Sequence, residues 1–206
     1  MKRSVGLLTF VLSAFISFAQ TPEQIISRMD QALSGCQEAG LSMVVDMAIP
    51  ILGNVTTTNY FLGDRLRTEG EIKGEKFISW SDGNTEWTYR VTDNIVEIRN
   101  AAAKSSAQEG DIGLFTNITD GYDVTLTSET DSQWDLLCKK NKSNKDKNSP
   151  KTMHLSVYKA TCFPKSLSFK MSGITVTMRK LSFGVSEKQV LFDIGDYPDA
   201  KVVDRR

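Results

Sequence analysis

Few residues of this chain have the types and spacing that catalysis requires. His154 is the only histidine among 206 residues, and no cysteine or second histidine stands at the spacing of a zinc site or a histidine-dependent triad. Glycine-rich phosphate loops, Gly-x-Ser-x-Gly elbows and Cys-x-x-Cys pairs do not occur. Glu69 and Glu71 share one face of a predicted strand, as two glycosidase acids would, but a solvated strand face explains them better. The sequence therefore predicts no enzyme, no catalytic residue, no metal site and no cofactor.

The three cysteines are Cys36, Cys138 and Cys162. Cys138 and Cys162 lie in strand-like segments that flank one loop, so a disulfide between them is the favoured pairing in an exported protein, and Cys36 is left over. Three buried free thiols are the alternative, because an odd number of cysteines gives no disulfide framework.

The beginning of the chain has the charged, apolar and small-residue zones of a secretory signal. Two basic residues precede an apolar run over residues 5–18, and small residues follow before Gln20. The run is shorter than the ~20 apolar residues that a membrane-spanning helix needs. We expect residues 1–19 to be removed as a signal peptide and residues 20–206 to fold as a single exported domain.

The charges of the chain exclude one class of partner. Basic and acidic residues number 25 each, and loss of the signal segment removes two of the basic ones. No basic stripe with interleaved aromatic residues is present, so nucleic acid is a poor candidate for a partner.

A short amphipathic helix is predicted directly after the signal segment. Thr21 can cap it, Pro22 suits its first position, and Gln24 can complete a capping box. Four apolar residues then recur at helical spacing, and Gly35 is a plausible end. They are Ile25, Ile26, Met29 and Leu33.

From residue 41 the apolar period changes to two, which predicts half-buried strands. Residues 41–49 alternate in this way, and the alternation recurs with turn chemistry between segments over 55–62, 64–73, 75–81, 84–90 and 94–99, and again between 122 and 194. Residues 101–119 interrupt the pattern and predict a loop with one or two short helices. About eleven antiparallel strands with little helix must close on themselves, stack or be capped. Capping of a wide curved sheet by two or three short helices would leave a cavity.

Three segments resemble the periplasmic outer-membrane lipoprotein carrier (LolA-like) family. They are a Ser-Asp-Gly hairpin with its Trp-x-Tyr strand at Ser81-Asp82-Gly83 and Trp87-Thr88-Tyr89, the late strand opening from Phe163 to Phe169, and an ending in which Phe192 precedes Tyr197-Pro198-Asp199 and Val202-Val203-Asp204-Arg205. They appear in the family's order and at comparable spacing.

The resemblance implies an unclosed antiparallel β-barrel with a helical lid, whose interior holds acyl chains of lipoproteins in the periplasm. A monomer would receive an acylated lipoprotein or related lipid from an inner-membrane extraction complex and pass it to an outer-membrane receptor. The family's lid is held by an arginine before the hairpin, which best matches Arg65, with Arg67 one pleat away. The expected acyl contacts are Met43, Val45, Met47, Trp87, Phe169, Met171, Met178 and Phe192.

Two hypotheses from other classes stay open. In the first, the same half-barrel is filled by its own side chains and serves as an envelope structural or sensor module that binds a protein along an edge strand. In the second, the protein is a hydrolase, which would need acidic residues clustered in a cleft, and the sequence shows no such cluster.

Overall fold

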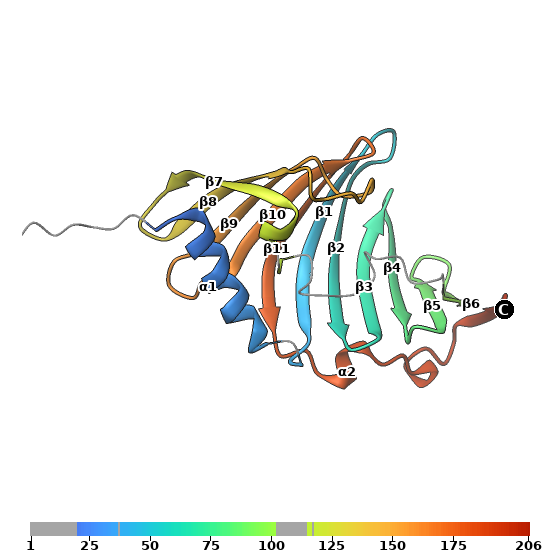
Figure 1. Ribbon diagram of the computed structural model, residues 1–206. Coiled ribbons are helices and arrows are strands. Elements are labelled where there is room, and N and C mark those ends of the chain that lie inside the picture. Colours follow the sequence, from blue (N-terminus) through green and yellow to red (C-terminus); the bar gives the residue numbers. More distant parts are fainter. Residues whose placement is uncertain (1–19, 37, 102–114, 117) are drawn as a thin grey trace, which may run out of the picture.

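The computed structural model of the protein describes residues 20–36, 38–101, 115–116 and 118–206 (Figure 1). The predicted signal segment and most of the 101–119 segment, where the sequence predicts short helices, lie outside the described residues. No helix within the described ranges is long and apolar enough to cross a lipid bilayer.

One mainly antiparallel sheet dominates the described chain. Its strands are β1 (Leu41–Ile49), β2 (Gly53–Leu62), β3 (Arg65–Ile72), β4 (Glu75–Ser81), β5 (Thr85–Arg90), β6 (Ile95–Asn100), β7 (Tyr122–Glu129), β8 (Gln133–Lys140), β9 (Thr152–Tyr158), β10 (Pro164–Met171), β11 (Ile174–Phe183) and β12 (Lys201–Asp204). The spatial order is β12-β6-β5-β4-β3-β2-β1-β11-β10-β9-β8-β7, and only β12 and β6 run parallel. The predicted unclosed sheet is confirmed. The strand-like alternation expected over residues 190–194 is wrong, because Glu187–Val190 form a short helix and Ile194–Asp196 a 3-10 turn, and the short β12 was not expected.

The pairing register divides the side chains of the sheet between two faces. Leu155 pairs with Leu167, Leu167 with Met178, and Met178 with Val45. Directly paired residues point the same way, so these four mark one face, which we call the first face. The opposite side of the sheet is the second face.

Helix α1 (Pro22–Ser34) covers part of the first face and confirms the predicted helix. Thr21 Oγ1 accepts a hydrogen bond from the Gln24 backbone N–H at 3.3 Å, and the Gln24 side chain accepts from the Thr21 N–H at 3.1 Å. This capping box satisfies two N–H groups that a helix start otherwise leaves unpaired. Gly35 forms the C-cap.

The main core lies between α1 and strands β7 to β10. Ile25, Ile26, Met29 and Leu33 are at most 1% exposed and pack on the first-face residues of these strands. Phe115 and Ile118, the latter in the 3-10 helix η2 (Ile118–Asp120), join the same cluster. The predicted helical lid therefore includes α1, which closes one side of the sheet.

The C-terminal segment covers the second face of β2 to β5, whereas α1 lies on the first face of other strands. It runs from α2 (Glu187–Val190) through η3 (Ile194–Asp196) to β12, and it is the red part of Figure 1. The ring of Phe192 lies 5.3 Å from the rings of both Trp80 and Trp87, and the ring of Tyr197 lies 4.4 Å from that of Tyr89. Aromatic packing thus holds this segment against β4 and β5.

The predicted Cys138–Cys162 disulfide is wrong, because all three cysteines are free. Cys138 is opposite Met153 near the start of β9, whereas Cys162 lies in the turn after Tyr158 at its other end. The strand between Met153 and Tyr158 spans about 16 Å at ~3.3 Å per residue, and bridged cysteines have Cα atoms within about 7 Å. Sequence spacing does not reveal at which end of a hairpin each sulfur lies.

Substitution of Leu155 tests the core beneath α1. Leu155 is 1% exposed, so Leu155→Ala is expected to lower the free energy of unfolding by about 2–5 kcal/mol through lost burial and a cavity. His154 is exposed on the second face, and His154→Ala should change it by less than about 0.5 kcal/mol. Urea denaturation measures both, and equal effects of the two variants would contradict this core.

Thiol titration tests the absence of a disulfide. The denatured protein should show three free thiols, and a reducing agent should leave the urea midpoint unchanged. Burial raises the pKa of the Cys138 thiol to about 11, so this thiol should react slowly in the folded protein at neutral pH. A titration that finds a single free thiol would contradict the structure and support the Cys138–Cys162 disulfide.

Candidate functional site

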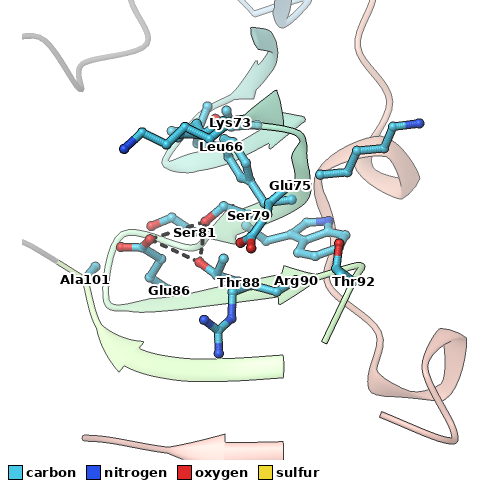
Figure 2. Close-up of a pocket in the computed structure, with 15 residues that line it drawn as sticks. Leu66, Lys73, Glu75, Ser79, Ser81, Glu86, Thr88, Arg90, Thr92 and Ala101 are labelled. Atoms are coloured by element: carbon cyan, nitrogen blue, oxygen red, sulfur yellow. Dashed lines mark hydrogen bonds between the residues drawn. The ribbon is translucent and has the colours of Figure 1, made fainter. Parts of the chain in front are cut away.

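A cavity of about 710 Å³ opens on the first face over β3, β4 and β5, beyond the strands that α1 covers. Figure 2 shows its lining, which comes from these strands and from the turns that join them. The lining residues used below are Leu66, Thr68, Ile72, Lys73, Lys76, Phe77, Ser79, Ser81, Glu86, Thr88, Arg90 and Thr92.

Three rows of paired residues bring these side chains together across the strands. The rows are Leu66–Ser81–Glu86, Thr68–Ser79–Thr88 and Gly70–Phe77–Arg90. Members of a row stand on one face because antiparallel partners project in the same direction. The cavity floor is therefore built by register, from residues that are dispersed along the sequence.

Gly70 makes room for the largest apolar side chain of the floor. A Cβ atom at Gly70 would lie 2.9 Å from Phe77 Cζ and 2.9 Å from Thr57 Cγ2, closer than packed carbon atoms approach. The ring of Phe77 occupies this space. Together with Leu66 and Ile72 it gives the cavity an apolar portion.

A hydrogen-bonded polar group forms the middle of the floor. Ser79 Oγ lies 3.0 Å from Thr88 Oγ1, and the two hydroxyl oxygens lie 3.3 and 3.4 Å from Glu86 Oε1. The dashed lines of Figure 2 mark these contacts. These polar atoms find partners within the protein, so an apolar ligand above them would not strip them of their hydrogen bonds.

A second polar group continues the floor toward β2. The Asn59 side-chain amide donates to Thr57 Oγ1 at 2.9 Å, and the Thr68 hydroxyl donates to Asn59 Oδ1 at 2.9 Å. Thr57 and Asn59 are 6% and 8% exposed. Their mutual hydrogen bonds account for polar side chains at such depth, since buried polar groups are normally paired.

Arg90 is the cationic group at the β5 side of the cavity. Its Nη2 lies 3.4 Å from Asp93 Oδ2 and 3.3 Å from Glu97 Oε1. Its Nε is buried and has no hydrogen-bond partner among the described residues. Arg90 thus contributes a positive charge, shared with two carboxylates, at this side of the cavity.

None of the eight predicted acyl-contact residues lines this cavity. Six of them lie on the first face but on neighbouring strands: Met43, Val45, Met47, Phe169, Met171 and Met178. Phe169 and Met178 pack against the α1 core, and Met43 is 3% exposed. These six residues share a face with the cavity, which lies farther along the sheet, and their role as acyl contacts stays a prediction.

Trp87 and Phe192 stand on the second face, which corrects their assignment to one cavity with the other six. Their rings stack on each other with an interplanar angle of 17°. Trp87 pairs directly with Trp80, so both tryptophans point to the same side. Parity along a single strand does not show which side that is, because the register between strands decides it.

The predicted latch arginines contact α2. Arg65 Nη1 lies 3.4 Å from Glu187 Oε1, and Arg67 Nη1 donates to the Gln189 backbone carbonyl at 3.3 Å. The predicted chemistry, an arginine that donates to a backbone carbonyl, is therefore present, but its acceptor belongs to α2. Their predicted partner, the 101–119 lid, lies mostly outside the described residues.

Several neighbouring groups hold the Arg67 side chain in the position from which it donates to the Gln189 carbonyl. Its guanidinium carbon lies 5.7 Å from the ring centroid of Tyr60 and 5.6 Å from that of Trp80, and Nη2 pairs with Glu69 Oε1 at 2.5 Å. These cation–π and ionic contacts fix the side chain on the second face. Arg67 thus fastens the C-terminal segment on the side of the sheet opposite the cavity.

Sequence reasoning missed the residues that line the cavity. A signal was present, because Thr68, Ser79, Ser81 and Thr88 occupy alternating positions in strands that were predicted correctly. The predicted acyl contacts were instead assigned to large apolar residues. Hydroxyl side chains on a partly covered face are the better indicator of a floor that must tolerate water when no ligand is bound.

Comparisons with known proteins give structural neighbours only. No protein-family model matches the chain, and no curated protein matches it. Similar solved structures include an uncharacterised conserved protein from Thermus thermophilus, at 17% identity and a TM-score of 0.47 over 89% of this chain and 98% of that one. The Pseudomonas aeruginosa MucA/MucB complex aligns at 13% identity and 0.44, over 88% and 63%. A LolA superfamily protein from Nitrosomonas europaea aligns at 11% and 0.32, over 85% and 99%.

Gly70→Ala tests the packing of the cavity floor. The added methyl group meets the Phe77 ring and Thr57, so we expect a loss of about 1–3 kcal/mol in the free energy of unfolding. The cost should shrink when Phe77→Ala is present as well, because one clashing group is then gone. A double-mutant cycle by urea denaturation measures this coupling, and strictly additive effects would refute the contact.

Proposed function

We propose that the protein binds an acyl chain, or a similarly slender apolar ligand, in the first-face cavity and holds it by reversible burial. The observation that supports this most directly is the cavity of about 710 Å³ on the part of the sheet that α1 leaves uncovered. Small-molecule sites typically enclose about 300–1,000 Å³ with apolar walls and a few polar groups.

The chemistry of the lining suits such a ligand. Leu66, Ile72 and Phe77 offer apolar contacts, and the hydroxyl groups beside them are already hydrogen-bonded. Each methylene group that leaves water contributes about 0.8 kcal/mol. The positive charge of Arg90 at the β5 side of the cavity would attract a carbonyl or carboxylate oxygen at the head of the chain, which would fix its direction.

The resemblance of the sequence to lipoprotein carriers gives this binding a biological setting. In that setting the exported protein receives an acylated lipoprotein or lipid in the bacterial envelope and delivers it to a receptor with higher affinity. Binding without covalent chemistry needs no catalytic residue, and transfer is driven by the difference in affinity between the two binding partners. The inner-membrane complex and the outer-membrane receptor are part of the proposal.

A protein-binding module is the second candidate, and the free edge of β7 favours it. Strand β7 ends the sheet, and none of the described strands pairs with its outer side. Such an edge presents backbone N–H and C=O groups that can accept a strand from a partner. In this case the cavity would be an incompletely filled core.

Filling the cavity distinguishes the two candidates. Ser79→Phe places a ring over the floor and should weaken binding of a fluorescent fatty acid at least about tenfold, equal to ~1.4 kcal/mol. Thr175→Phe makes a comparable change at an exposed position on the second face and should leave the affinity unchanged. Fluorescence titration gives the affinities, and circular dichroism verifies that both variants fold.

Native mass spectrometry of protein purified without detergent tests the same proposal independently. Bound acyl species that disappear in Ser79→Phe and persist in Thr175→Phe would support the carrier function. A wild-type protein that carries no lipid and takes up no fatty acid would overturn it in favour of the protein-binding module.

A further inference from the structure

Five connections between strands gather at one end of the sheet, which we call the lysine rim. They are the β8–β9 loop (141–151) and the turns β10–β11 (172–173), β1–β2 (50–52), β3–β4 (73–74) and β5–β6 (91–94). Several of these lie at the upper side of the sheet in Figure 1. A Cβ atom at Gly173 would lie 3.8 Å from Pro50 Cγ, so the β10–β11 and β1–β2 turns touch.

The lysine rim carries most of the strongly exposed apolar residues of the described chain. Nine large hydrophobic residues are exposed in the described chain as a whole, and five of them lie at this one end of the sheet. Single exposed apolar residues are ordinary, but a group of them at one edge indicates an interaction surface. The five are Ile51, Leu52, Ile72, Val91 and Met171.

Ile51 stands out in both exposure and backbone conformation. Its side chain is fully exposed, at 104%, and its φ is +72°. This is the left-handed region, which a β-branched residue adopts only at an energetic cost. Glycine or asparagine usually occupies such a position after a turn proline like Pro50. An isoleucine here weakens the turn and is fully exposed, so its side chain is free to contact something outside the protein.

Positive charge surrounds these apolar tips. The segment 139–151 contains six lysines and one acidic residue, Asp146, whose carboxylate accepts hydrogen bonds from Asn148 and Ser149 of the same loop. Exposed lysines also stand in or beside the β10–β11 and β3–β4 turns, where Glu71 and Glu75 offset part of the charge. Asp93 of the β5–β6 turn is paired with Arg90. The exposed lysines are Lys73, Lys76, Lys139, Lys142, Lys145, Lys147, Lys151 and Lys170.

The opposite end of the sheet has the reverse character. A hollow there is lined by Glu38, Asp64, Asp82 and Glu187 around Arg65. The molecule is therefore polarised, with exposed apolar and cationic side chains at the lysine rim and carboxylates at the far end. A negatively charged surface would attract the first end and repel the second.

We propose that the lysine rim docks onto the surface of an anionic lipid bilayer. Ile51 and Leu52 insert among the headgroups, and the lysines lie against lipid phosphates. Apolar tips combined with lysines are the chemistry by which proteins associate with membrane surfaces. Lys73 and Thr92 belong both to the cavity lining and to turns of this rim, and Ile72 ends strand β3 beside them, so docking brings the cavity to the lipid. The docking itself does not depend on what the cavity holds.

Ile51→Gly is the central test, because it removes the inserted side chain and relieves the strained φ together. Its free energy of unfolding should equal or exceed that of the wild type. Its partition onto vesicles of phosphatidylcholine with phosphatidylglycerol should fall about tenfold or more, as expected for loss of a buried isoleucine side chain. Vesicle flotation measures the partition.

A matched pair of variants separates the rim from general surface hydrophobicity. Leu52 and Leu191 are 44% and 47% exposed, the first on the lysine rim and the second beside α2. Leu52→Ser should reduce vesicle binding, and Leu191→Ser should leave it unchanged. Equal losses for both variants would overturn the assignment of the rim.

The lysines are tested with the triple variant Lys142→Gln, Lys145→Gln and Lys147→Gln. It should lose most of the preference for anionic over pure phosphatidylcholine vesicles, and added salt should weaken wild-type binding in the same way. Wild-type protein that stays off anionic vesicles would overturn the proposal, even if a crosslinker at position 51 captured an envelope protein. Fatty-acid binding by the same variants in the absence of vesicles reports on the cavity separately.

Discussion

The architecture depends on one constraint, which is that within the described residues a wide open sheet has only one long helix to cover it. Twelve strands at ~4.8 Å spacing extend about 53 Å, whereas a 13-residue helix is about 20 Å long. Helix α1 can therefore shelter about four strands, and it lies over β7 to β10. Helix α1 does not cover the first face of the remaining strands, and the cavity lies there.

The cavity floor over β3, β4 and β5 consists of side chains that suit both water and an apolar ligand. Paired hydroxyl, amide and carboxylate groups occupy its middle, while Phe77 and Leu66 flank them. An all-apolar face would favour aggregation, and unpaired polar groups would oppose ligand burial. Polar groups that hydrogen-bond to one another avoid both penalties, so the face can exist filled or empty.

Over β2 to β5 the second face is covered by the chain's own C-terminal segment, so at these strands a ligand can reach the sheet from the first face. Phe192 and Tyr197 pack on the aromatic rings of β4 and β5, Arg67 holds α2, and β12 covers the outer edge of β6. The lysine rim stands at the ends of the strands, where hairpin turns tolerate exposed side chains without disturbing the sheet.

The local pattern of the sequence was sufficient for α1 and for strands β1 to β11, but not for α2 and β12. Capping residues defined α1, and apolar alternation located the strands, because both signals act between residues close in the chain. The face to which each strand turns, the separation of Cys138 from Cys162, the attachment of Arg67 to α2 and the cavity lining were decided only by the tertiary structure. Each depends on the register between strands, and a shift of one residue exchanges the two faces without changing the periodicity of either strand.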